Sequence, residues 1–530
     1  MRTPMHLAIT LALITVTPSC SSRGGDSGTG TAADTRGGKP GRTGTGAPGS
    51  AAVGTGAPGV AADGTLVPAP GADLTGPVAP PSPGEPRPAR VVAPLDLGSD
   101  RAAIAVELPR PPRGGAASFS FGEERHGWVT RIPEANQLPS VAYGGGRIYV
   151  SGGFESVSFY GLDAATGRIE WASQALEDNG PTAPLYIAKD GDGDGDEGRV
   201  VFNTESCTLF VMEARTGKKL WFKYLGDPTL SQPAVSAGLV IAAHPGGSAH
   251  ELTAYRIRNG NPVWTRGIDG ELLAAPVIAD GAVYASSVAG TTYKFDLKSG
   301  RKAWSRRLRA TTAPWLVGDR LHVSRKAGGR EVQTVVSAAT GEVIASHGSS
   351  DGKYLGDVPK DLNDWKKVWA FEGSRPAVLH GVRYVAMGGR IEASDAASGE
   401  LLWVRRYAPA EDQRSVGAVA VAGSQLVVAT RKGEVFGLDI DTGYTVWAYA
   451  TGAQIVAQPI VARGWVYLST TDGQVIALEV ADASLDGWHM WGGDPHHNGL
   501  VTTSTEAAAA ATAATAPDAI PAVATTPASP

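Results

Sequence analysis

The residues best suited to chemistry form an acidic run in the first half of the chain. Asp190, Asp192, Asp194 and Asp196 alternate with glycines, and a further carboxylate follows them. Alternating carboxylates on a glycine-rich turn allow the backbone to curl around a hard cation, and Ca²⁺ prefers oxygen ligands. The opening matches that of a calcium-binding loop, but Val201 stands where such a loop has its bidentate glutamate. The run therefore predicts either a Ca²⁺ site or a solvated acidic turn between strands.

Other side chains with reactive potential are few. The chain has 2 cysteines, Cys20 and Cys207, which excludes a disulfide framework and a multi-cysteine metal cluster. Cys207 alternates within a predicted strand, so we expect a small buried hydrophobe rather than a nucleophile. His496 and His497 are adjacent. Adjacent side chains on an extended chain point to opposite faces, which favours packing over metal binding. We assign no catalytic residue and no cofactor-binding residue.

The N-terminus has the pattern of an export signal. Arg2 precedes an apolar run at residues 7–16, which is too short to span a bilayer and has the length of a signal-peptide core. The run leads to Thr17-Pro18-Ser19-Cys20, which resembles a bacterial lipobox. We therefore expect residues 1–20 to form a signal peptide, with Cys20 as a lipidation site and this lipid as the only contact with a membrane. The alternative is ordinary cleavage beside an incidental cysteine.

Both ends of the chain are low in sequence complexity. Residues 21–115 are rich in Gly, Ala, Pro and Thr, and residues 501–530 are rich in Ala, Thr and Pro. Such stretches cannot bury enough apolar surface to offset the entropy of ordering, so we expect a disordered linker and a disordered tail. The net charge of −5 gives no basic field for nucleic acid. The folded part is thus expected at residues 116–500.

A repeat occupies this middle part of the chain. A glycine is followed four residues later by tryptophan in several copies, and Gly341 begins one more copy in which Ala345 replaces the tryptophan. The glycines of successive copies lie 40 to 58 residues apart. Periods of this length, built from short strands and glycine turns, are typical of propeller blades. The complete copies are Gly167 and Trp171, Gly217 and Trp221, Gly260 and Trp264, Gly300 and Trp304, Gly399 and Trp403, and Gly443 and Trp447.

A second marker, proline, precedes a short apolar run ahead of most repeat units. Proline is tolerated at the first residue of a strand, so each marks a strand start. Each unit has room for four strands. We therefore predict an all-β fold, an eight-bladed β-propeller of four-stranded antiparallel blades. The less favoured alternative is a seven-bladed ring with additional β structure. The segment around Trp128 is expected to be an outer strand that completes the last blade, and Trp488 is counted as the last tryptophan of the series.

The repeat resembles that of the pyrroloquinoline quinone (PQQ) repeat family of β-propellers. The resemblance covers about residues 127–499, and the segment from Trp488 to Gly499 is similar to that family's closing segment. The family contains enzymes, the quinoprotein dehydrogenases, and non-enzymes such as the BamB lipoprotein of the outer-membrane β-barrel assembly machinery. The resemblance therefore implies the β-propeller fold but does not distinguish an enzyme from a non-enzyme.

Several features disfavour quinoprotein chemistry. Many quinoprotein alcohol dehydrogenases carry adjacent cysteines against PQQ, whereas the predicted propeller has Cys207 alone and the chain has no Cys-x-x-Cys-His haem motif. We expect the non-enzymatic branch: an exported scaffold, lipid-anchored at the outer membrane or in the periplasm, that needs no PQQ. It would bind an envelope protein through its loops and a polar central channel. The alternatives are a PQQ-dependent dehydrogenase and a Ca²⁺-dependent adhesion or surface-binding module.

Overall fold

The computed structural model describes most of the chain between Leu95 and Asn498, and this part consists of β-strands and their connections. No helix in it is long and apolar enough to cross a bilayer. The described residues are 95–153, 156–174, 182–188, 198–204, 208–226, 231–247, 250–327, 330–353, 376–387, 390–407, 418–480, 482 and 484–498.

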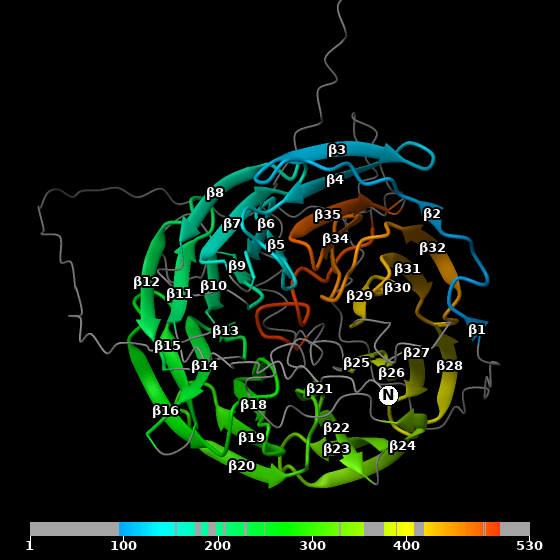
Figure 1. The fold of residues 1–530 in the computed structure, drawn as a ribbon. Helices are drawn as coiled ribbons and strands as arrows, with labels where there is room; N and C mark the ends of the chain where they lie inside the picture. The colour runs from blue at the N-terminus through cyan, green and yellow to red at the C-terminus, as the bar shows by residue number, and fades with distance from the viewer. Residues whose placement is uncertain are drawn as a thin grey trace, which may run out of the picture. The chain divides into compact units, whose positions relative to one another are not determined.

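The strands form eight sheets that surround a common centre like the blades of a propeller (Figure 1). Each blade has four core strands joined by antiparallel pairing, and its innermost strand is three residues long. The predicted marker prolines lie one to three residues ahead of these innermost strands. The predicted all-β, eight-bladed propeller is confirmed.

The first four blades follow one another along the chain. Blade 1 consists of β5 (Ala142–Gly144), β6 (Arg147–Ser151), β7 (Ser158–Asp163) and β8 (Ile169–Gln174). Blade 2 consists of β9 (Leu185–Ile187), β10 (Arg199–Asn203), β11 (Thr208–Glu213) and β12 (Lys219–Tyr224). Blade 3 consists of β13 (Ala234–Ser236), β14 (Leu239–Pro245), β15 (His250–Arg256) and β16 (Pro262–Ile268). Blade 4 consists of β17 (Val277–Ala279), β18 (Ala282–Ser286), β19 (Thr291–Asp296) and β20 (Lys302–Arg307).

The remaining blades complete the ring. Blade 5 consists of β21 (Trp315–Val317), β22 (Arg320–Ala327), β23 (Arg330–Ser337) and β24 (Val343–Lys353). Blade 6 consists of β25 (Ala377–Leu379), β26 (Val382–Met387), β27 (Arg390–Asp395) and β28 (Leu401–Arg406). Blade 7 consists of β29 (Ala420–Ala422), β30 (Gln425–Ala429), β31 (Glu434–Asp439) and β32 (Thr445–Ala450). Blade 8 combines β33 (Ile460–Ala462), β34 (Trp465–Ser469) and β35 (Gln474–Glu479) with a strand from the other end of the domain, β4 (Arg125–Arg131).

The ring closes in blade 8, where the two ends of the domain meet. Strand β4 pairs antiparallel with β35, and Trp128 lies opposite Ala477. The predicted role of the Trp128 segment as the outer strand of the last blade is therefore confirmed. Closure of this kind joins the first and last parts of the domain by backbone hydrogen bonds and removes two sheet edges that would otherwise invite aggregation.

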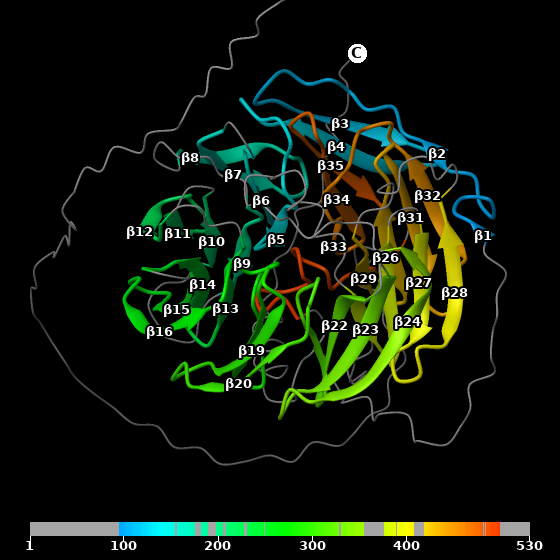
Figure 2. The same cartoon turned by 60° about the horizontal axis from the view of Figure 1, so that its bottom comes forward.

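The segment at residues 95–121, here called the N-terminal strap, adds a fifth strand to three consecutive blades (Figure 2). Strand β1 (Leu95–Asp96) pairs parallel with β28, and β2 (Ile104–Ala105) pairs parallel with β32. Strand β3 (Ala116–Phe121) pairs antiparallel with β4. Apolar side chains of the strap, Leu97, Val106 and Phe121, are buried against the blades.

The strap corrects the predicted start of the domain and adds a strand to the four predicted for three of the blades. Residues 95–115 belong to the propeller and not to the predicted linker at 21–115, so the predicted domain start at residue 116 is about twenty residues late. Blades 6, 7 and 8 have five strands rather than four. Strands of two residues have no alternation of apolar and polar positions, and their isolated apolar anchors are hard to recognise within a proline-rich stretch.

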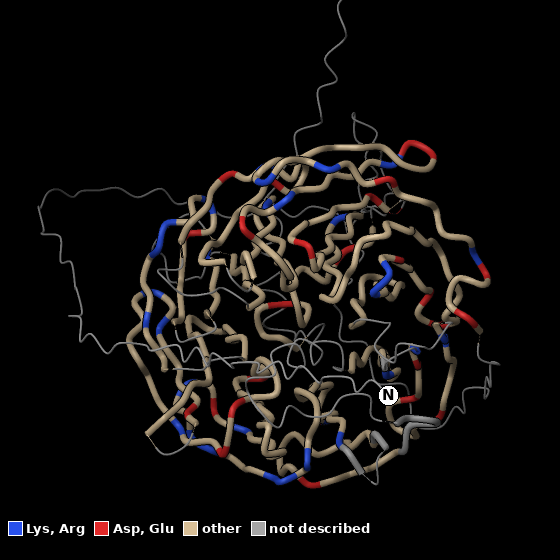
Figure 3. Tube along the Cα trace, viewed as in Figure 1, with Lys and Arg blue, Asp and Glu red and all other residues tan. Residues whose placement is uncertain are grey.

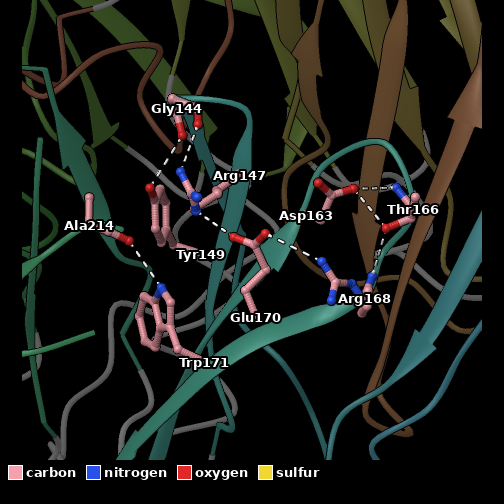
Figure 4. Close-up of polar contacts among 10 residues, drawn as sticks. Gly144, Arg147, Tyr149, Asp163, Thr166, Arg168, Glu170, Trp171 and Ala214 are labelled. Atoms are coloured by element: carbon pink, nitrogen blue, oxygen red, sulfur yellow. Dashed lines mark hydrogen bonds and ion pairs between the residues drawn. The ribbon is translucent and has the colours of Figure 1, made fainter. Parts of the chain in front are cut away.

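Neighbouring blades interlock through the repeat glycine and tryptophan. The glycine of each turn has φ between 65° and 76°, a backbone conformation that favours glycine. It packs on the tryptophan of the preceding blade, so closely that a Cβ atom added to Gly217 would lie 2.4 Å from the Trp171 ring. The indole Nε1–H of Trp171 donates to the carbonyl of Ala214 at 3.0 Å, and the turn of blade 1 is held by hydrogen bonds from Thr166 to Asp163 (Figure 4).

Blade 5 departs from this pattern because Ala345 stands at the tryptophan position. The side chain of His347, two residues further along β24, occupies the corresponding place beneath Gly399 of blade 6. A Cβ atom added to Gly399 would lie 2.5 Å from the Cβ and Cγ atoms of His347. The histidine thus takes over the packing role of the missing indole.

Candidate functional site

The centre of the ring is occupied by residues 484–498, the last segment of the chain that the structure describes, here called the closing segment (Figure 1, orange to red). Each innermost strand is an edge of its sheet. Its N–H groups that point away from the sheet, toward the centre of the ring, need hydrogen-bond acceptors. The middle residue of five of these strands donates its N–H to the closing segment. The bonds run from Tyr143 to His489 O (2.7 Å), from Val235 to Pro495 O (2.9 Å), from Ile278 to His496 O (2.9 Å), from Leu316 to Asn498 Oδ1 (2.9 Å) and from Val461 to Trp488 O (2.8 Å).

Aromatic side chains of the closing segment are packed among the blades. Trp488 and Trp491 are each 1% exposed, and Trp488 stacks on Trp315 with the ring centroids 6.1 Å apart. The predicted polar central channel is therefore wrong at this level of the ring, because buried indoles lie there. Trp488 is also not the last outer-strand tryptophan: it bridges to innermost strand β33, and Trp128 supplies the outer strand of blade 8.

The two adjacent histidines lie within this packed region. His497 is 0% exposed, and its Nδ1 and Nε2 atoms lie 3.0 Å and 2.8 Å from the carbonyl oxygens of Trp491 and Pro233. Both ring nitrogens of His497 are therefore engaged with main-chain oxygens rather than directed at a metal position. His496 Nδ1 lies 3.4 Å from Asp494 Oδ1. Within the described residues no group of three or more metal-ligating side chains is gathered.

A buried carboxylate that the sequence pattern does not reveal, Glu271, lies in the connection between blades 3 and 4. Glu271 is 1% exposed, and its Oε1 accepts hydrogen bonds from the Ser231 hydroxyl (2.7 Å) and the Leu272 N–H (2.9 Å). Its Oε2 lies 3.7 Å from His250 Nε2. Burial raises the pKa of Glu271, although the hydrogen bonds from Ser231 and Leu272 act in the opposite direction. Burial and the nearby His244 lower the pKa of His250, so both shifts favour an uncharged pair.

Three sequence-derived site predictions fall outside the described residues. They are the acidic run Asp190, Asp192, Asp194 and Asp196, the lipidation site Cys20, and the lone thiol Cys207. The residues that flank the acidic run are described: Ile187 ends innermost strand β9, and Gly198 precedes β10. The Ca²⁺ site and the lipid anchor stay predictions.

The fold and its closure define the class of protein. Eight interlocked blades with a Gly-x-x-x-Trp repeat, closed by an N-terminal outer strand, make the domain a β-propeller of the PQQ-repeat class. A family model described as outer membrane protein assembly factor BamB matches residues 120–347 and 365–528. This match covers more than half of the chain, and the chain belongs to that family.

Similarity to individual proteins is lower and partial. Outer membrane protein assembly factor BamB of Burkholderia pseudomallei is 30% identical over 168 residues, which are 29% of this chain and 42% of the relative. The chain thus spans less than half the length of this curated relative. The crystal structure of BamB from Moraxella catarrhalis has 19% identity and a TM-score of 0.47, covering 69% of this chain and 98% of that one. Quinohemoprotein alcohol dehydrogenase ADHIIG from Pseudomonas putida HK5 has 14% identity and a TM-score of 0.50, covering 68% and 76%, a likeness of fold alone.

Proposed function

We propose that this protein is an exported, lipid-anchored scaffold of the bacterial cell envelope that binds protein partners during outer membrane protein assembly. Membership of the family described as outer membrane protein assembly factor BamB supports this reading. The main structural support is the closing segment, whose Trp488 and Trp491 are buried within the ring. Because this segment fills the centre, the outer strands and turns are the surfaces available for binding a partner. Propellers commonly use such rim surfaces and loops for binding.

Catalysis with PQQ is the competing function, and its support is a fold-level likeness to a quinohemoprotein dehydrogenase. We propose that the protein works without PQQ, because the propeller has a single cysteine in place of an adjacent pair. Isothermal titration of the full chain with PQQ in a Ca²⁺-containing buffer is expected to give no binding heat. Tight PQQ binding, followed by oxidation of an alcohol or a sugar with an artificial acceptor, would instead establish an enzyme.

Anchoring is tested by fractionating cells that express the full chain or its Cys20→Ala variant. The wild-type chain is expected in the membrane fraction, because acylation of Cys20 supplies apolar chains that partition into the bilayer. The variant lacks the acyl chains and is expected in a soluble fraction with unchanged thermal unfolding. If both chains distribute alike between the fractions, the proposed anchor is wrong. The scaffold role is tested separately, by identifying the proteins that bind the chain.

A further inference from the structure

The outer strand of blade 2, β12, presents an apolar face at an open sheet edge. Leu220, Phe222 and Tyr224 alternate along this strand and are 42%, 53% and 66% exposed. A β-bulge interrupts the pairing of β12 with β11 at Leu220, and beyond it Phe222 and Tyr224, two residues apart, share one face of the strand. No other strand pairs with the outer edge of β12 among the described residues. An exposed apolar stripe on an unpaired edge is a hazard that proteins avoid unless it is used.

The residue that follows the repeat tryptophan differs between covered and uncovered blades. In the three blades with a fifth strand it is apolar and buried, and in blades 1, 3 and 4 it is small. The buried residues are Val129, Val404 and Ala448, and the small ones are Ala172, Thr265 and Ser305. Phe222 holds this position in blade 2 and is the exception, because it is large, apolar and exposed. Blade 2 therefore has a large apolar side chain at this position, as blades 8 and 6 have with Val129 and Val404, but without a cover in the described structure.

The protein itself shows how such an edge is covered. After β1 and β2, the strap donates the N–H of Leu97 to Arg406 O (2.5 Å) and the N–H of Val106 to Ala450 O (2.9 Å). The Leu97 and Val106 side chains become 9% and 5% exposed against blades 6 and 7. An extended segment thus binds an outer edge by main-chain hydrogen bonds and inserts an apolar side chain, which is the mode of strand addition.

The charge around β12 indicates the chemistry of the missing strand. Lys218 in the preceding turn is exposed, and Lys219 and Lys223 on the strand are partly exposed. Lysine and arginine positions recur along the outer strands of the ring (Figure 3). The residue at the Lys218 position of the turn is a glutamate, Glu342 or Glu400, in blades 5 and 6. Lysines on an edge strand repel a second copy of the same edge, because like charges would face one another. Lys218 and Lys219 attract a segment that carries carboxylates, whereas the Lys223 Nζ lies 5.5 Å from the centroid of the Tyr255 ring.

We propose that β12 is the docking edge for an extended acidic segment of a partner protein, which adds to blade 2 as a fifth strand. Apolar side chains at alternate positions of that segment would cover Leu220, Phe222 and Tyr224, and its carboxylates would meet the lysines. This inference names the surface of the scaffold role proposed above and rests on it. It gives blade 2 the same five-stranded form as blades 6, 7 and 8.

The probe for this site is a synthetic peptide of alternating valine and glutamate, titrated against the full chain at low salt. Binding is expected to slow hydrogen exchange of the β12 amides, and Phe222→Ser is expected to weaken affinity about tenfold. Val263→Ser is the matched control, since Val263 is 36% exposed on the outer strand β16 of blade 3 and should leave the affinity unchanged. A peptide with lysine in place of glutamate is expected to bind more weakly. Thermal unfolding checks that both variants keep the fold.

Four outcomes would overturn the proposal. They are equal binding by wild type and Phe222→Ser, protection that maps to another blade, protection of β12 by anionic lipid vesicles but not by the peptide, and concentration-dependent dimers that protect β12 without any peptide. The proposed scaffold function is judged separately, by recovery of envelope proteins with the full chain. If Phe222→Ser recovers the same partners in the same amounts, the scaffold role stands and the β12 site fails.

Discussion

At the scale of single residues, stability depends on the contact between each repeat tryptophan and the glycine turn of the next blade. Trp171 is 9% exposed, lies against Gly217 and donates to Ala214 O. The large ring fills the space between two blades, and the glycine permits both the positive φ and the close approach. The contact therefore joins adjacent blades rather than stabilising one blade alone.

Replacement of this indole tests the interlock. Trp171→Ala is expected to lower the free energy of unfolding by about 3–5 kcal/mol, because it removes a buried aromatic side chain and leaves a cavity between blades 1 and 2. Urea unfolding followed by circular dichroism measures the change. Val263→Ala on exposed β16 serves as control and is expected to change stability by less than about 0.5 kcal/mol. A loss below about 1 kcal/mol for Trp171→Ala would contradict the interlock.

The buried Glu271 predicts a pH dependence of stability. A carboxyl group whose pKa is raised by folding contributes stability that is full below its unfolded pKa and is lost as pH rises through the folded pKa. Glu271→Gln keeps the acceptor for Ser231 and Leu272 but cannot ionise. The variant is therefore expected to unfold at a higher temperature than the wild type near pH 8 and at a similar temperature near pH 4.

Calorimetric scans over this pH range measure the effect. Glu400→Gln, at an exposed position in the turn of blade 6, is the control and should follow the wild-type profile. If Glu271→Gln lowers the unfolding temperature at every pH, the buried carboxylate is ionised and held by favourable interactions, which contradicts the uncharged pair.

The acidic run stays a prediction at the residue scale. Titration of the full chain with Ca²⁺ is expected to give a binding signal that Asp192→Ala abolishes, because that substitution removes a carboxylate from the centre of the run. Equal signals from the two chains would place any bound Ca²⁺ elsewhere, and the absence of a signal from the wild type would leave a solvated acidic turn.

At the scale of elements, the N-terminal strap is held by a cluster at the junction of blades 6 and 7. Asp100 accepts hydrogen bonds from the N–H and hydroxyl of Thr445 at 2.7 Å and 2.8 Å, and Arg405 Nη2 lies 3.7 Å from its carboxylate. Burial alone raises the pKa of Asp100, but the Thr445 hydrogen bonds and the Arg405 charge outweigh it and lower the pKa. The ionised carboxylate thus fastens the strap to the two blades.

Asp100→Asn is expected to loosen the strap at neutral pH. A lowered folded pKa contributes stability above the unfolded pKa, and that stability is lost as pH falls through the folded pKa. Hydrogen exchange of the Leu97 and Val106 amides should therefore be about tenfold faster in the variant near pH 7, with the difference shrinking in acid. Asp96→Asn, at an exposed position of β1, is the control. Unchanged exchange in Asp100→Asn would show that the backbone pairing alone holds the strap.

The elements that can be predicted from the sequence are those marked by a motif that is repeated along the chain. The glycine turns, the tryptophan strands and the closing role of the Trp128 strand follow from a repeated spacing. The strap does not, because β1 and β2 are two residues long and depend on the exposed edges of β28 and β32. Substitution of His347 for a missing indole, and the burial of Glu271, depend on neighbours in other blades that no local pattern reveals.

At the scale of the whole molecule, both ends of the domain are used to complete the ring. The N-terminal strap covers the outer edges of three blades, and the closing segment joins the innermost strands of five. Blades 1 to 5 keep open outer edges in the described structure, and among them blade 2 has the large apolar side chains Phe222 and Tyr224 exposed. The propeller that the structure describes is thus packed at its centre, and its outer edges differ from blade to blade.

Binding of envelope proteins through the rim of this propeller is tested most directly by cross-linking in cells. A photoreactive amino acid is placed at position 222 on β12 or at position 303 on β20, and the cross-linked peptides are identified by mass spectrometry. Position 222 is expected to form adducts with an extended acidic segment of an envelope protein, and position 303 is expected to form none. Equal labelling at the two positions, or no envelope protein at either, would contradict it.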